Sequence, residues 1–314
     1  MRFGRNTVHA LFVLSLPVIV AMFGLGVVSA IALVLVALLW RWGLTLTGLL
    51  SKATGPELTL ETISVSHFVE KVRWCMDRLG VPYTEQHNVA TVGAFFIGRT
   101  VPRLHVRTGA VISVIGDSPA ILRYLWGRYA AEFGERAVFL EPGKEALALE
   151  AETDRYGVLM QQWIYHHILP HRKLTLHLWG LNDPTLPGWQ RAVIFFGFPV
   201  IRVMMRRAFR LTPGSHPRTV EKTEAFLQRM EGRLADGRQT LLGGEPGFAD
   251  ITFAALSGIW VRPENYGGGK ATAVRPDDAA YPESLETEVL RWKQSYPNVT
   301  AFVERMYQEH RGSS

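Results

Sequence analysis

The sequence has almost no cysteine. Cys75 is the only one among 314 residues, so no intramolecular disulfide can form, which fits a reducing compartment. Internal repeats and low-complexity tracts are also absent. Hydrophobic residues make up 47% of the chain, which is ample for the cores of two folded domains.

Concentrated basic patches are lacking as well. The net charge is +6, but the arginines and lysines are spread through helix-like segments and do not alternate with aromatic residues. Binding to a phosphate backbone needs a contiguous basic footprint. We therefore expect no nucleic-acid partner.

No charged residue occurs between Ala10 and Trp40. About 20 apolar residues cross a bilayer as a helix, so residues 10–40 are predicted to be a transmembrane segment between a tail at 1–9 and a linker at 41–56. The competing interpretation is a cleaved signal peptide, with small residues at 28–30. Another apolar stretch follows at once and would stop transfer, so we expect a single-pass N-terminal anchor.

The apolar run is long for one span. At about 1.5 Å per residue, a helix over 10–40 exceeds the roughly 30 Å hydrocarbon core. One tilted helix is the simpler interpretation, and a hairpin that turns at Gly24-Leu25-Gly26 is the alternative. Trp40 and Trp42 flank Arg41, a pattern typical of an interfacial anchor. Basic residues lie on both sides of the run and leave its orientation open.

Periodicity predicts an ordered series of elements from residue 57 onward: strand, helix, strand, hairpin and helix. Apolar residues after Ser66 recur every three or four positions, and Gly80 supplies a helix stop. The predicted segments are 58–63, 66–79, 82–89, 101–106 with 111–116, and 117–129.

This order, with Val101-Pro102 before the third strand and Asp117-Ser118 before the last helix, resembles the thioredoxin-like domain of glutathione transferases. The segment "SHFVEKVRWCMDRLGVPYTE" is similar to the first helix and second strand of that family. "GGEPGFADITFAAL" is similar to the start of its buried C-terminal helix, and "SYPNVTAFVERMYQEHR" to its closing helices. The chain is identified as similar to serine-type, membrane-anchored, bacterial-like members.

The resemblance implies a fold in two parts after the transmembrane helix. The first is an α/β thioredoxin-like domain at 57–131, which would bind glutathione. A linker at 132–146 would lead to the all-α glutathione transferase C-terminal domain at 147–311.

Ser66 stands where a strand runs into a helix. A serine there can act as an N-cap, worth about 1 kcal/mol. The same position carries the positive end of the helix dipole, which favours a thiolate, and a hydroxyl can donate to the sulfur. The resemblance places the activating serine at Ser66, although His67 stands where relatives often have proline. Ser64 and a purely structural cap are the alternatives.

The resemblance also implies a glutathione-binding site. The Val101-Pro102 bond would be cis and would turn the Val101 backbone towards glutathione, whereas an ordinary edge-strand proline is the alternative. Asp117 and Ser118 would hold the γ-glutamyl carboxylate at a helix N-terminus.

Three other features receive structural interpretations. Cys75 lies on the apolar helix face and should be a small buried hydrophobe. Four histidines fall within 166–177, but Pro170 interrupts the segment and no carboxylate or cysteine is near in sequence, so no metal is expected. Asp250 matches a folding motif of the family, with Gly247 as a weak N-cap.

Residues 189–210 contain five arginines and no acid. One interpretation is a core helix of the second domain, broken by Pro199, with a solvated basic face. The other is a segment that lies on anionic lipid.

The resemblance implies an enzyme with glutathione as co-substrate. Ser66 would stabilise the thiolate, which attacks a small apolar electrophile, and the partners would be these two molecules and the lipid bilayer. The catalytic domain is expected in the cytoplasm, and a homodimer is one option for the oligomeric state. A non-catalytic binding or assembly protein is the alternative. The absence of cysteine at the helix start argues against a thiol-disulfide oxidoreductase.

Overall fold

The computed structural model describes residues 12–13, 15–16, 18–20, 22–24, 26–49, 55–88, 101–109, 111–275 and 280–312. The tail expected at 1–9 lies outside these residues. The chain divides into two compact units. One comprises Met1–Glu57 with Val106–Ser113, and the other Leu58–His105 with Val114–Ser314.

The N-terminal apolar run contains a turn. Helix α2 spans Val27–Leu49, and its part Val27–Leu46 is long and apolar enough to cross a membrane. Before it, the chain turns at Gly24, whose φ of +58° costs a glycine little. The ring centroids of Phe12 and Trp40 are 6.4 Å apart, so the segment before the turn lies back against α2.

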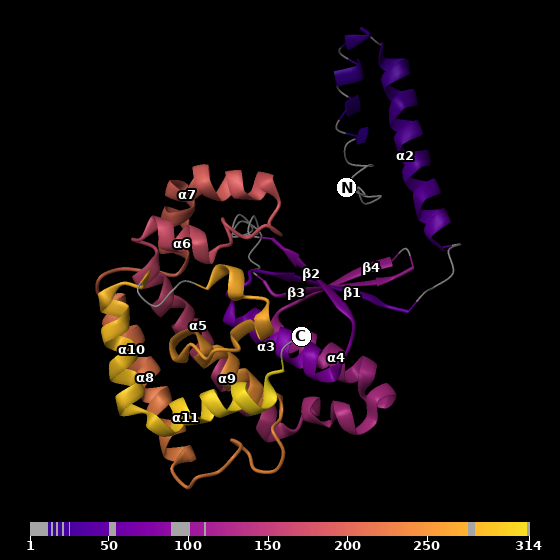
Figure 1. Ribbon diagram of the computed structural model, residues 1–314. Coiled ribbons are helices and arrows are strands. Elements are labelled where there is room, and N and C mark those ends of the chain that lie inside the picture. Colours follow the sequence, from indigo (N-terminus) through magenta and orange to yellow (C-terminus); the bar gives the residue numbers. More distant parts are fainter. Residues whose placement is uncertain are drawn as a thin grey trace. The chain divides into compact units, whose positions relative to one another are not determined.

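The prediction of one continuous helix over 10–40 is therefore wrong, and the structure has the hairpin alternative (Figure 1). Glycine is a poor residue for a helix interior, and here it supplies the turn. Helix α2 also continues to Leu49, so the segment expected to be a linker from residue 41 begins as helix.

A mixed four-stranded sheet with the order β2-β1-β3-β4 forms the first part of the fold that follows α2. Strands β1 and β2 are parallel, with Leu58 opposite Tyr83, and helix α3 connects them. Strands β3 and β4 follow each other as the predicted hairpin. The bounds are β1 Glu57–Thr62, β2 Tyr83–His87, β3 Arg103–Thr108 and β4 Val111–Gly116.

Helices α3 (His67–Leu79) and α4 (Ser118–Phe133) pack against each other on one face of the sheet (Figure 1). The apolar face predicted for α3 is buried, and Cys75 within it has no exposed surface. Burial raises the pKa of the Cys75 thiol to about 12, so this cysteine is a small hydrophobe, as predicted.

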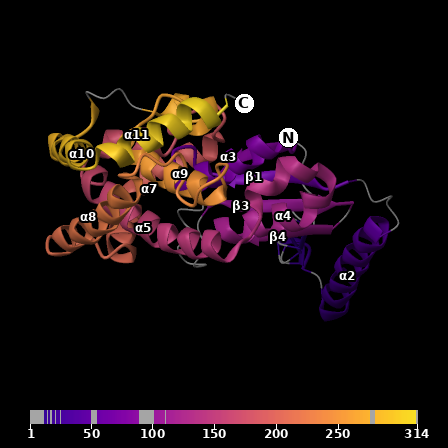
Figure 2. The same cartoon turned by 90° about the horizontal axis from the view of Figure 1, so that it is seen from below.

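The second part is all helical, as predicted. Helix α9 is almost wholly buried and contacts α3, α5 and α11 (Figures 1 and 2). The expected linker at 132–146 contains the 3₁₀ helix η2 and the start of α5. The bounds are η2 Gly134–Leu140, α5 Lys144–Ile168, α6 Arg172–Leu178, α7 Gly188–Ala208, α8 Ser215–Leu234, α9 Phe248–Val261, η3 Tyr266–Gly269, η4 Thr272–Val274, α10 Glu283–Ser295, α11 Pro297–Arg305 and the π-helical turn η6 Met306–His310.

The Asp250 side chain forms hydrogen bonds at the start of α9. Its carboxylate accepts hydrogen bonds from the backbone N–H of Leu241 at 2.7 Å and of Gly247 at 2.9 Å. These bonds tie Gly247 and the chain before it to the first turn of α9, while glycine itself has no side chain with which to cap the helix. The structural interpretation of Asp250 thus agrees with its contacts.

Helix α7 does not break at Pro199, contrary to the prediction. A proline inside a helix removes one N–H and leaves the carbonyl four residues earlier without its usual donor. Here that carbonyl belongs to Phe195, and the Nη2 of Arg172 donates to it at 2.9 Å. A side chain from α6 therefore replaces the missing backbone bond.

Candidate functional site

The hydroxyl of Ser66, at the start of α3, does not cap the helix. The backbone N–H of Ser66 donates to the carbonyl of Ile63, and the carbonyl of Ser66 accepts from the N–H of Glu70, both at 2.9 Å. The Ser66 side chain makes no capping hydrogen bond, and it has no partner among the residues that the structure describes. The expected side-chain cap is therefore wrong, because the helix begins with the backbone bond to the Ser66 carbonyl and without a bond from the Ser66 hydroxyl.

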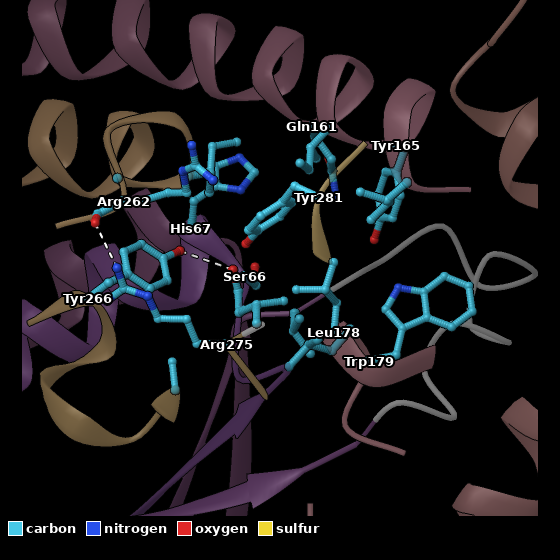
Figure 3. A pocket seen from close by; sticks show the side chains of 18 of the residues that line it. Ser66, His67, Gln161, Tyr165, Leu178, Trp179, Arg262, Tyr266, Arg275 and Tyr281 are labelled. Atoms are coloured by element: carbon cyan, nitrogen blue, oxygen red, sulfur yellow. Dashed lines mark hydrogen bonds between the residues drawn. The ribbon is translucent and has the colours of Figure 1, made fainter. Parts of the chain in front are cut away.

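The Ser66 hydroxyl lines a cavity of about 130 Å³ between the sheet end and the helical domain (Figure 3). Val65, Ser66 and Val101 lie on the thioredoxin-like side. The opposite wall is mainly apolar and aromatic, with side chains from α5, the end of α6, the end of α7 and the segment before α10. Its large residues include Tyr165, Leu178, Trp179, Met205, Phe209 and Tyr281.

Val101 and Pro102 lie at the base of β3. Their peptide bond is cis, as the resemblance implied. Val101 is buried and lines the same cavity as Ser66. The structure therefore brings together two of the residues that the sequence singled out, from segments 35 positions apart in the chain.

Asp117 and Ser118 form the N-terminus of α4. Asp117 has a φ of +80°, a conformation that a non-glycine residue adopts at a cost of about 1–3 kcal/mol and that is commonest at functional sites. Ser118 is 1% exposed, and its Oγ is buried without a hydrogen-bond partner in the described part of the chain. Such an orphaned hydroxyl at a helix N-terminus suits an anionic ligand.

Asp154 is a nearby residue that the sequence analysis missed. Burial raises its pKa, and the negative charges of Glu150 and Asp117 act in the same direction, against the Lys71 ammonium 2.9 Å away. Asp154 lies on α5, and no motif in the sequence marks it. Its carboxylate places negative charge beside the N-terminus of α4.

His67 also lines the cavity, but its ring nitrogen is engaged by the backbone of α5. Its Nε2 lies 2.9 Å from the carbonyl oxygen of Gly157, and burial lowers its pKa to about 4. A Cβ on Gly157 would come within 2.9 Å of the Phe68 ring, so glycine allows α3 and α5 to approach this closely. The histidine that replaces the usual proline is a neutral link between these two helices.

Ser64 is engaged elsewhere. It is 4% exposed, and its Oγ lies 2.9 Å from Nδ1 of His87. It is not among the residues that line the cavity. Of the two serines considered from the sequence, only Ser66 has its hydroxyl at the cavity.

The two arginines at the cavity are already paired. Arg262 makes two 2.7 Å hydrogen bonds to the carboxylate of Glu286. Arg275 donates through Nη2 to the carbonyl of Arg262 at 2.8 Å and through Nη1 to two further carbonyls (Figure 3). Glu286 neutralises Arg262, and backbone carbonyls accept the hydrogen bonds of Arg275. The rest of the wall opposite Ser66 is mainly apolar.

The chain matches two family models. Residues 60–133 match the glutathione S-transferase N-terminal domain, and residues 213–305 match the glutathione S-transferase C-terminal domain. Together these matches cover just over half of the chain. No match was found among curated proteins.

Solved structures with a similar arrangement include three glutathione transferases. The one from Methylobacillus flagellatus, solved with glutathione bound, is 16% identical over 81% of this chain and 96% of its own, with a TM-score of 0.47. The theta-class enzyme from Xanthomonas axonopodis pv. citri, with glutathione bound, is 20% identical over 82% and 97%, with a TM-score of 0.39. The rice enzyme in complex with glutathione is 16% identical over 82% and 90%, with a TM-score of 0.44.

The order of the two matched domains is also the order of the sheet and the helical part in the structure. The chain therefore belongs to the glutathione S-transferase family.

Proposed function

We propose that this chain is a membrane-anchored glutathione transferase that joins the glutathione thiolate to a small apolar electrophile. The observation that carries the proposal is the Ser66 hydroxyl, which is not used as a cap and faces an apolar cavity at the N-terminus of α3. A free thiol has a pKa of about 8.5. The helix dipole and a hydrogen bond from Ser66 would both favour the thiolate and lower this value towards neutrality.

Glutathione would be held by groups at the starts of α4 and β3 and by one carboxylate of α5. The γ-glutamyl carboxylate would accept hydrogen bonds from the Ser118 hydroxyl and from the backbone N–H groups at the start of α4. The Asp154 carboxylate would attract the ammonium of the same γ-glutamyl group. The backbone of Val101 would pair with the peptide backbone of glutathione. Each contact uses a different part of the tripeptide, which leaves its sulfur for Ser66.

The electrophile would occupy the wall opposite Ser66. Trp179, Met205 and Phe209 offer apolar surface there, while Arg262 and Arg275 are held by other partners. The thiolate would attack an electrophilic carbon, forming a C–S bond as the leaving group departs with its electron pair. Apolar contacts favour a substrate with little charge of its own.

The test is conjugation of glutathione to an aryl halide by the full-length chain in mild detergent. Ser66→Ala should lower the rate by about 100-fold, as for the loss of one donor to a developing anion. Ser64→Ala is the matched control and should leave the rate unchanged. Glutathione binding without any conjugation, or no glutathione binding at all, would overturn the catalytic proposal and leave the non-catalytic binding or assembly alternative.

Two surfaces support a membrane location. The first is α2, with its apolar span Val27–Leu46. The second is α7, which is apolar on both sides. Its inner side buries Ile194, Phe198 and Met205 in the core. Its outer side exposes a stripe at alternating spacings of four and three residues: Trp189 (58% exposed), Val193 (46%), Phe196 (78%), Val200 (64%) and Val203 (46%).

The charged residues of α7 itself are all positive. Arg202, Arg206 and Arg207 on α7 are exposed, and no acidic residue occurs between Pro187 and Pro213. An apolar helix face flanked by arginines is typical of a segment that lies in the interface of an anionic bilayer. We therefore favour the lipid interpretation of this segment, with α2 crossing the bilayer.

The buried single cysteine allows a direct test of α7. A polarity-sensitive fluorophore on Phe196→Cys, in the full-length chain reconstituted into vesicles, should shift to the blue when anionic lipid is present. The matched control is the same label on Leu290→Cys, which is 58% exposed on α10 and should not shift. A shift that depends on protein concentration and not on lipid charge would indicate a second copy of the chain and contradict the proposal.

A further inference from the structure

A second polar cluster joins three helices outside the glutathione site. His167 lies at the end of α5, His216 at the start of α8 and Glu288 in α10. The Nε2 of His216 is 2.8 Å from Oε1 of Glu288, and the Nε2 of His167 is 3.4 Å from Oε2. One ligand atom from each residue lies within 4.8 Å of the other two. None of these residues lines the cavity beside Ser66.

Neighbouring side chains orient these groups. Nδ1 of His167 lies 3.1 Å from Oγ of Ser284, so that a hydrogen bond from Nδ1–H leaves the Nε2 lone pair facing Glu288. The indole N–H of Trp163 donates to Oε2 of Glu288 at 2.7 Å. Hydrogen bonds of this kind, from the far nitrogen of a histidine and to a carboxylate oxygen, are the usual support of metal ligands.

His166 stacks on the His216 ring, with ring centroids 3.9 Å apart, and this contact limits the rotation of the His216 side chain beside Glu288.

We propose that His167, His216 and Glu288 bind one zinc ion, through the two Nε2 atoms and the carboxylate, with water as the fourth ligand. Two imidazoles and one carboxylate are a ligand set that zinc adopts in tetrahedral sites. The three ligands come from α5, α8 and α10, so the ion would join three helices of the second domain. Its role would be separate from conjugation at Ser66.

Zinc content and thermal stability test this proposal. The full-length chain in mild detergent is stripped with a chelator, given Zn²⁺ alone, and washed. One equivalent should remain and should raise the melting temperature, since a ligand that binds only the folded state stabilises it. Co²⁺ in its place should give the absorption spectrum of a tetrahedral site. No retained metal would overturn the proposal.

The zinc affinities of three variants distinguish binding at this site from binding by other histidines. Glu288→Gln keeps the shape of the side chain, and it should lower zinc affinity by at least about 100-fold, as should His216→Ala. Ser284→Ala should lower it by about 10-fold through the lost support of His167. The control is His171→Ala, an exposed histidine of the same sequence segment, which should retain full affinity. Equal zinc binding by wild type and Glu288→Gln would overturn the proposal.

Discussion

The polar side chains at the start of helix α3 and those along its length differ in whether they have hydrogen-bond or ion-pair partners. At the start, the Ser66 hydroxyl has no partner in the described part of the chain and faces a cavity. Further along, the side chains of Glu70, Lys71 and Arg73 have no exposed surface, and each is paired. Arg73 reaches Glu85 at 2.8 Å.

The paired groups also hold the C-terminal end of the chain. Nε of Arg311 lies 2.8 Å from Oε1 of Glu70, and its Nη1 lies 2.9 Å from Oδ2 of Asp77. The Trp74 indole N–H donates to the carbonyl of His310 at 3.0 Å. Buried charges must be paired because desolvation is costly. The paired groups of α3 maintain the fold, whereas the hydroxyls of Ser66 and Ser118 have no partner within the described residues and are the groups that we propose to bind a ligand.

The largest effect should come from breaking the buried pairs. Arg311→Met leaves Glu70 and Asp77 buried with one cation fewer, and it should lower the free energy of unfolding by about 3–5 kcal/mol. Urea unfolding of the full chain, followed by tryptophan fluorescence, measures this. The matched control is Arg229→Met, which breaks an exposed pair with Glu152 and should cost at most about 1 kcal/mol. Equal losses would remove the contrast between buried and exposed pairs.

The pH dependence of the free energy of unfolding tests whether the buried, neutral His67 helps to maintain the fold. Its pKa is about 4 when folded and about 6.5 when unfolded, so the unfolded chain binds more protons between these values. Stability is therefore full above about pH 6.5 and falls as the pH drops towards 4, by roughly 3 kcal/mol in total. Urea unfolding between pH 4 and 7 should show this slope, and His67→Gln should flatten it. A slope that His67→Gln leaves unchanged would assign the acid sensitivity to other groups.

Replacing Ser118 tests whether its unpaired hydroxyl binds glutathione. Ser118→Ala should weaken glutathione binding by about 1–3 kcal/mol through the lost hydrogen bond to a carboxylate. It should not lower stability, because the hydroxyl has no internal partner to lose. Calorimetric titration with glutathione and urea unfolding give the two values. Lower stability with unchanged binding would reverse the roles that we assign.

Ser66→Ala should also leave stability almost unchanged. A capping serine contributes about 1 kcal/mol, but this one makes no side-chain cap, so Ser66→Ala should change stability by less than about 0.5 kcal/mol. The thiol pKa of bound glutathione should nevertheless rise, because its hydrogen-bond donor is gone. Thiolate absorbance against pH, with both proteins saturated by glutathione, measures this rise. Identical titration curves would leave Ser66 without an activating role.

Local pattern predicted the elements of the thioredoxin-like part closely. The apolar spacing after Ser66 gave α3, whose end at Gly80 uses a φ of +77° as expected of a glycine stop. The local pattern gave wrong predictions at two positions where other parts of the structure decide the backbone conformation. Pro199 remains within a helix because Arg172 supplies the missing donor. The apolar run over 10–40 contains a turn at Gly24, which hydrophobicity alone does not reveal.

The sequence by itself determined the apolar N-terminal segment and the order of strands and helices, because periodicity and helix starts depend on neighbouring residues. Ser66, Val101 and Ser118 were singled out by the resemblance to the glutathione transferase family. Only the tertiary structure decided which polar groups have partners. Glu288 reaches His167 although 121 positions separate them, and this removes the premise that no carboxylate lies near the histidines. Hydrogen bonds and ion pairs act over a few ångströms in space. Which residues come that close depends on how the helices pack, and a linear pattern does not contain that information.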